Sequence, residues 1–110
     1  MNILMIEPNE TPYDERISGS YMEVYRIVGG CPKVLYPFAD KSVALVCNED
    51  GKASDLPANR VVRDENGDVE TIVGTFFLCG VTDECLDSLP PVKMLRYKAK
   101  FQKPGAFPQD

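Results

Sequence analysis

The sequence predicts an α+β domain with a mixed, mainly antiparallel sheet of about five to six strands. Short apolar runs bounded by Gly, Pro, Asn or Asp recur along the chain, as is typical of strands. Two segments, 20–28 and 91–101, instead place apolar residues at helical spacing. The expected strands outnumber the helices and do not alternate strictly with them, which favours α+β over α/β. We expect one helix after the second strand and two short C-terminal helices.

The first half of the chain contains four expected strands. Residues 2–7 are expected to form a buried strand around the apolar run Ile3–Ile6, and prolines mark the turn to a charged, edge-like strand at 13–17. Two more strands follow at 33–37 and 43–48. The last of these begins with five consecutive apolar residues, so we expect both of its faces to be covered.

The helix between these strand pairs has signals at both ends. Ser20 and Glu23 have the spacing of a capping box, and Gly29-Gly30 provides a C-terminal stop. Four apolar residues at helical spacing form a stripe expected to face the core: Tyr21, Val24, Tyr25 and Val28.

The second half begins with a polar loop over 48–60. Asn66-Gly67 is a strong hairpin signal, because both residues tolerate positive φ. A long strand is expected over 71–81, with Gly74 marking a bulge or a close approach.

Two short helices are expected to close the chain. Thr82-Asp83-Glu84 has the cap and acids that begin a helix, and Pro90 ends it. Pro91 suits the first turn of the final helix, whose apolar face carries Met94, Tyr97 and Phe101. The sequence therefore predicts one domain over 1–101 and a flexible tail over 102–110.

Composition limits the classes of function. The chain has 110 residues, of which 44% are hydrophobic and 26% are charged, as in an ordinary globular domain. No apolar run approaches the roughly 20 residues of a membrane span. The first residues lack a basic region before the apolar run, so we expect a cytoplasmic protein with no membrane partner.

The content of histidine and cysteine argues against several chemistries. The chain has no histidine, which excludes Ser-His-Asp and Cys-His nucleophilic catalysis. No Cys-x-x-Cys pair occurs either, and together with the missing histidine this argues against a structural zinc site. No cofactor is expected. The four cysteines are expected to be buried thiols: Cys31, Cys47, Cys79 and Cys85.

Charge is distributed unevenly. Residues 93–110 carry five Lys or Arg against one acid, a net +4, so residues 1–92 carry −9 of the total −5. We therefore expect no direct binding of nucleic acid, whereas a basic protein surface would suit the acidic body.

The polar loop is the best candidate for a binding site. The candidate residues can donate and accept hydrogen bonds or carry charge, and Gly74 and Thr75 are expected beside the loop: Asn48, Glu49, Lys52, Asn59, Arg60, Gly74 and Thr75. A structural alternative is that the asparagines cap turns and that Arg60 pairs with a nearby acid. No EF-hand loop or phosphate-binding loop is present, so no metal site is expected.

A resemblance reaches the same stretch. Distinct blocks of residues carry it: Glu7-Pro8, Val28-Gly29-Gly30, Val34-Leu35-Tyr36-Pro37-Phe38, Cys47-Asn48-Glu49-Asp50-Gly51-Lys52, Leu56-Pro57-Ala58-Asn59-Arg60 and Gly74-Thr75-Phe76-Phe77. Over roughly residues 3–81 the chain resembles a bacterial domain-of-unknown-function family numbered 3846. That family occurs in gut Firmicutes, their phages and conjugative elements, so the resemblance implies a mobile-element context and no particular activity.

Two hypotheses follow. The first is a non-enzymatic binding or accessory module that holds a small anionic molecule or a protein segment at 48–60. The alternative is an acidic inhibitor of a protein interaction, of the antirestriction kind. No catalytic residue is assigned, and a homodimer is left open. The first hypothesis predicts that Arg60→Ala abolishes binding while leaving the melting temperature nearly unchanged.

Overall fold

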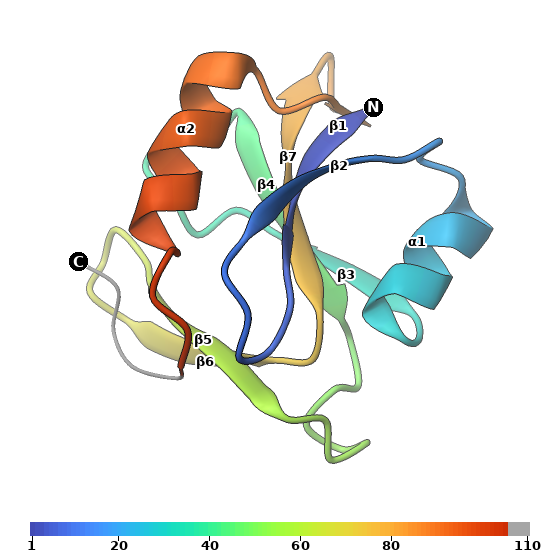
Figure 1. Ribbon diagram of the computed structural model, residues 1–110, viewed down its shortest axis with the longest axis vertical. Coiled ribbons are helices and arrows are strands. Elements are labelled where there is room, and N and C mark those ends of the chain that lie inside the picture. Colours follow the sequence, from blue (N-terminus) through green and yellow to red (C-terminus); the bar gives the residue numbers. More distant parts are fainter. Residues whose placement is uncertain (106–110) are drawn as a thin grey trace.

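The computed structural model describes residues 1–105 of the chain (Figure 1). Strands and helices follow in the order β1 (Asn2–Ile6), β2 (Tyr13–Arg16), α1 (Tyr21–Val28), β3 (Pro32–Leu35), β4 (Val43–Asn48), β5 (Ala58–Arg63), β6 (Val69–Val73), β7 (Phe76–Thr82), β8 (Cys85–Asp87) and α2 (Pro91–Lys100). The α+β class is confirmed. The described part of the chain contains two helices, however, and not the three that were expected.

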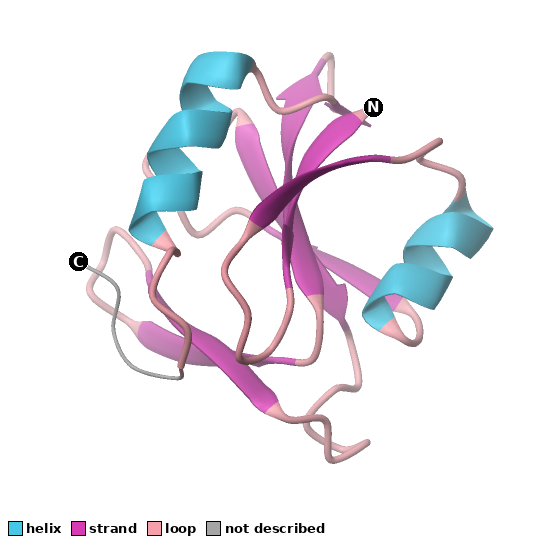
Figure 2. Cartoon of the chain, viewed as in Figure 1, coloured by secondary structure: helices cyan, strands magenta, loops and turns pink. Residues whose placement is uncertain are grey.

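A central antiparallel sheet and a separate hairpin organise the fold (Figure 2). The central sheet has six strands in the order β2-β1-β7-β4-β3, and β8 also pairs with β7. β1 pairs with the first half of β7 and β8 with the second half, while β4 pairs along the opposite edge. β5 and β6 form a two-stranded sheet of their own.

Alternation along the strands builds a core on each face of the central sheet. One core contains Ile3 and Met5 of β1 and receives α1 through Val24 and Val28. The other contains Leu4 and Ile6 and receives α2 together with the β5–β6 hairpin. All six residues of β4 are buried, so the prediction that both of its faces are covered is confirmed.

Capping defines α1. The Ser20 side chain accepts a hydrogen bond from the Glu23 backbone, and Gly29 adopts a left-handed conformation at the C-terminal end. The Glu23 carboxylate does not complete a capping box. It accepts instead from the backbone of Ser18 and Gly19, 2.6 and 3.1 Å away.

The expected core stripe of α1 was partly wrong. Val24 and Val28 are buried, whereas Tyr21 and Tyr25 are exposed. This eight-residue helix therefore meets the sheet along its two valines, and its tyrosines lie in solvent.

The helix expected at residues 82–89 is a β-hairpin. Thr82 pairs with Cys85, and both turn residues, Asp83 and Glu84, have positive φ of 50° and 65°. Such a two-residue turn matches the natural twist of antiparallel strands. β8 forms because β1 leaves the second half of β7 unpaired, and the missing side chain of Gly80 admits the Ser88 carbonyl: a Cβ there would lie 2.3 Å from that oxygen.

The single strand expected at 71–81 is two strands in different sheets. Gly74 has a φ of +74°, which breaks the strand between β6 and β7. The polar loop is likewise shorter than expected, because β5 already begins at Ala58 and includes Asn59 and Arg60.

The remaining sequence predictions concern cysteines and the tail. Cys47 and Cys79 are buried, but Cys31 and Cys85 are exposed. Burial raises the pKa of the Cys79 thiol to about 12. The flexible tail predicted for 102–110 falls largely on residues 106–110, which lie outside the described residues.

Candidate functional site

Asn48 ends β4 and joins three segments. Its Nδ2 donates to the Val28 carbonyl at the end of α1, 3.1 Å away, and its Oδ1 accepts from the Asp50 amide at 2.7 Å. Gly30 lies against this amide, and a Cβ there would be 2.8 Å from Nδ2. Asn48 therefore fixes the path of the chain between α1 and the following turn.

The turn after Asn48 presents charged side chains. Backbone bonds close it, with Ser54 donating to the Asp50 carbonyl and Leu56 donating to the Gly51 carbonyl. Glu49 and Lys52 are exposed on this turn. Gly51 is buried, and a Cβ there would lie 2.7 Å from Cγ2 of Val73, so the turn packs closely on β6.

A β-bulge directs Asn59 and Arg60 inward together. Ala58 pairs with Val73 and Arg60 pairs with Ile72, so Asn59 is the extra residue in β5. In a regular strand these neighbours would point to opposite faces. Because of the bulge, both side chains are completely buried.

Asn59 ties the hairpin to the central sheet. Its Nδ2 donates to the Ile6 carbonyl at 2.8 Å and to the Gly74 carbonyl at 2.9 Å. Its Oδ1 accepts from Nη1 of Arg60 at 2.8 Å. One amide thus links β1, β5 and the chain break that separates β6 from β7.

Arg60 uses every N–H of its guanidinium inside the protein. Nε and Nη2 donate to the Phe101 carbonyl at 3.2 and 3.0 Å, and Nη2 also donates to the Glu10 carbonyl at 2.7 Å. Nη1 donates to the backbone and side-chain oxygens of Asn59. Five donors therefore have acceptors, which is the full capacity of arginine. We call Asn59, Arg60 and these carbonyls the buried arginine cluster.

The buried arginine cluster holds a cation without a carboxylate. Within residues 1–105 no acid forms an ion pair with Arg60, contrary to the structural alternative drawn from the sequence. Burial lowers the pKa of Arg60, but an arginine stays protonated in proteins. The five hydrogen bonds to neutral oxygens compensate for the loss of water. These bonds hold the β1–β2 loop, β5 and the end of α2 together.

The seven candidate residues therefore fall into two groups. Asn59, Arg60 and Gly74 come together in the interior, with Thr75 half-buried beside them. Glu49 and Lys52 project from the exposed turn, and Asn48 anchors that turn. Ligand binding by these residues stays a prediction.

Two open cavities adjoin the turn that carries Glu49 and Lys52. One cavity of about 660 Å³ lies between the end of β3 and the β5–β6 hairpin, bounded by Leu35, Tyr36 and residues 64–72. A second, of about 340 Å³, is bounded by Lys33, residues 47–53 and residues 70–73. Lys52 and residues 70–72 line both, so the two cavities adjoin each other. Together we call them the acidic groove.

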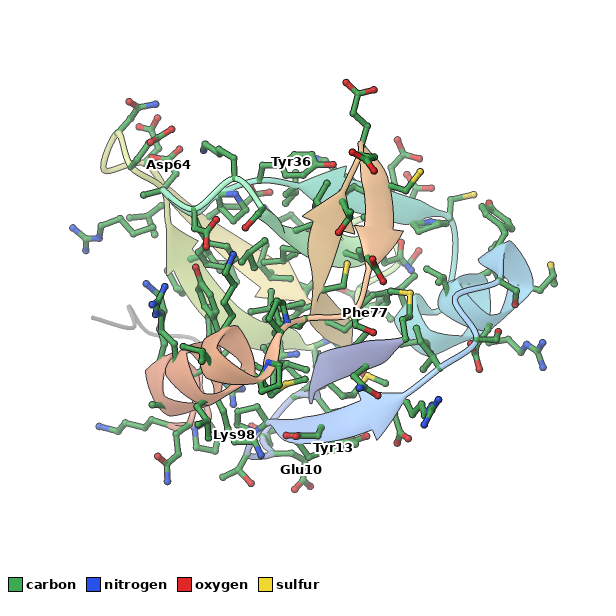
Figure 3. All side chains as sticks on the ribbon, turned by 90° about the horizontal axis from the view of Figure 1, so that it is seen from above. Glu10, Tyr13, Tyr36, Asp64, Phe77 and Lys98 are labelled. Carbon is green, nitrogen blue, oxygen red and sulfur yellow. The ribbon has the colours of Figure 1, made fainter. Side chains whose placement is uncertain are left out.

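Acids outnumber bases in this groove. Three lysines line it, against six acids: Glu49, Asp50, Asp64, Glu65, Asp68 and Glu70. Lys41 is held by Glu65 at 2.9 Å and by the Tyr36 carbonyl at 3.0 Å, so this pair cancels one charge of each sign and leaves the excess of acids unchanged. Tyr36 and Asp64 lie on one side of the molecule, opposite Glu10, Tyr13 and Lys98 (Figure 3).

Sequence reasoning missed the acidic groove. In the sequence, Asn66-Gly67 predicts only a hairpin turn at this place. The available signal was a pair of acids two residues apart after a strong turn: Asp68 precedes β6 and Glu70 lies within it. Their position opposite β3 depends on long-range packing, which no local pattern reports.

The fold and the acidic groove define an α+β protein of two sheets with an acidic recess between the end of β3 and the β5–β6 hairpin. The chain belongs to the family described as a domain of unknown function, DUF3846, whose profile matches residues 1–102. This confirms the resemblance and extends it over α2. No curated protein and no solved structure matches the chain significantly.

Membrane-spanning helices and metal-binding clusters are both absent from residues 1–105. None of the helices within 1–105 is long and apolar enough to cross a membrane. No group of three or more His, Cys, Asp or Glu side chains in that range is arranged to hold a metal ion.

Proposed function

We propose that the protein is a non-enzymatic binding module whose recognition surface is the acidic groove. The observation that carries this proposal is the pair of adjoining cavities lined by six acids and three lysines. A recess with an excess of one charge concentrates ligands of the opposite charge. The ligand is therefore a cationic segment of a protein partner.

This proposal relocates part of the site predicted from the sequence. Glu49 and Lys52 line the groove and remain in it. Arg60 has no N–H left to bind an anion, and Asn59 is fully engaged beside it. A small anionic ligand at these two residues is consequently disfavoured.

Titration calorimetry with a hexalysine peptide tests the proposal. The full chain should bind the peptide, with affinity falling as salt rises. Asp68→Lys/Glu70→Lys reverses two exposed acids and should weaken binding at least about tenfold. Asp14→Lys/Glu15→Lys makes the same change of net charge on exposed β2, away from the groove, and should have a much smaller effect.

Equal losses in the two double variants would contradict a localised groove and point to diffuse attraction. Absence of any binding to the unaltered chain would refute the cationic ligand itself.

An acidic inhibitor of the antirestriction kind is a second candidate. It is supported by the net charge of −9 over residues 1–92. In that function the groove would engage the basic surface of a DNA-binding enzyme. Capture of such an enzyme that persists unchanged at high salt would argue against charge mimicry.

A further inference from the structure

The acidic groove is bordered by an unpaired strand edge. β6 pairs with β5 alone, and β5–β6 is a sheet of only two strands. In an antiparallel pair, alternate residues direct their N–H and C=O groups away from the partner. Within residues 1–105, Val69–Val73 form no backbone hydrogen bonds beyond those to β5.

The edge of β6 is accessible from the groove. All five residues of β6 line one or both of the cavities that make up the groove. Val69 is 53% exposed, and Glu70 and Asp68 are exposed beside it. Such an edge is a template for another extended chain unless it is covered.

We propose that the groove takes an extended, Lys- or Arg-containing peptide segment that adds to β6 as a third strand. This inference rests on the proposed function, since it names the ligand of the same groove. Backbone hydrogen bonds to β6 supply affinity that is independent of sequence. Alternate side chains of the peptide then lie on the side of the sheet that carries Glu70.

Charge and length determine the occupant. Asp68 and Glu70 are two residues apart, so they select cationic side chains that also recur every second residue. The five residues of β6 extend over about 17 Å, which a peptide of five to six residues matches. A neighbouring hollow of about 460 Å³ is lined by three bases and three acids, so it lacks the excess of acids that the groove has: Arg63, Arg96, Lys100, Asp40, Asp64 and Glu65.

The core face provides an apolar floor. Leu35 and Ile72 line the same cavity as the acids, and both pack in the larger hydrophobic core. Glu70 and Ile72 are two residues apart in β6, so their side chains lie on the same face of the hairpin. A peptide whose side chains on that face are cationic opposite the acids and aliphatic opposite Ile72 would satisfy the acids and cover this floor. β2 is also an edge strand, at one end of the central sheet, and all four of its residues are exposed. The cavity beside β2 is a different one, and its lining carries both acidic and basic side chains.

A random decapeptide library displayed on phage tests the inference directly. Selection on the full chain, with counter-selection on Asp68→Lys/Glu70→Lys, should enrich sequences with Lys or Arg at alternate positions. Failure to enrich any sequence above the variant background would refute the proposed function itself.

Two N-methylated forms of the selected peptide separate strand addition from simple attraction. Methylation of every second backbone nitrogen in one register blocks the bonds to β6 and should weaken binding at least tenfold. Methylation in the other register, facing solvent, should change affinity less than threefold. Equal affinities for both forms would leave a cation-binding groove and overturn the pairing with β6.

Hydrogen exchange locates the added strand. On peptide binding, amides of Val69–Val73 that face the groove should be protected, and those of β2 should not. Protection confined to β2 or β3 would also overturn the inference.

Discussion

The buried arginine cluster and the acidic groove lie on the same hairpin but treat charge in opposite ways. Arg60 on β5 is fully buried, and five hydrogen bonds from its guanidinium end on protein oxygens. Asp68 and Glu70, beside and within β6, are exposed at a recess. A charged residue that forms all of its hydrogen bonds inside the fold stabilises the fold. A charged residue that lies at the surface can still form hydrogen bonds and ion pairs with a ligand. Exposure and hydrogen-bond saturation, not residue type, separate the two regions.

The largest effect is expected from Arg60→Ala. It leaves the carbonyls of Glu10 and Phe101 without their donors and opens a cavity, so it should lower the free energy of unfolding by at least about 3 kcal/mol. The melting temperature should fall by more than about 10 °C. Arg63→Ala, at the exposed end of β5, is the matched control and should change stability by less than about 0.5 kcal/mol. An unchanged melting temperature in Arg60→Ala would restore the expectation drawn from the sequence.

Asn59→Asp should be the next most disruptive change. The new carboxylate faces Arg60, but it removes the donor that serves the Ile6 and Gly74 carbonyls. We expect a loss of about 2 kcal/mol in urea denaturation. A gain in stability would show that an ion pair with Arg60 outweighs the two lost hydrogen bonds. The missing carboxylate would then limit the stability of the buried arginine cluster.

The acids of the groove should differ in how much each contributes to the stability of the fold. Asp64 Oδ1 accepts from the amides of Asn66 and Asp68, each at 2.9 Å, so it closes the hairpin turn. Asp64→Ala should cost about 1 kcal/mol. In Asp68→Ala the turn is retained, because only the backbone of Asp68 takes part in it, and stability should change by less than about 0.5 kcal/mol. Equal losses of stability in Asp64→Ala and Asp68→Ala would contradict the distinction between structural and ligand-binding acids.

The smallest effect concerns pH. Hydrogen bonds from Lys93 and Ser42 hold the pKa of Asp40 well below its usual range. A lowered pKa in the folded state means that the carboxylate stabilises the protein above its ordinary pKa of about 4. That contribution is lost as the pH falls below this value. Asp40→Asn should therefore cost no more than about 1 kcal/mol at pH 7, and the difference should shrink in acid.

Local signals predicted most of the elements. The Ser20 cap and the glycine stop predicted α1, and the apolar run of β4 predicted its burial on both faces. Prediction was wrong where a pattern had two physical solutions. Thr82-Asp83-Glu84 can cap a helix or turn a hairpin, and the vacant edge of β7 selected the hairpin.

For the candidate site, too, the sequence predicted some features and the tertiary structure decided others. The sequence alone determined the class of fold, the absence of histidine chemistry, the acidic body and the polar character of 48–60, because these depend on composition and short-range spacing. Only the tertiary structure decided that a bulge buries Asn59 with Arg60 and that β6 faces β3 across a recess. Burial and the pairing of edges arise from contacts between residues far apart in the chain, such as Arg60 with Phe101, so no local pattern encodes them.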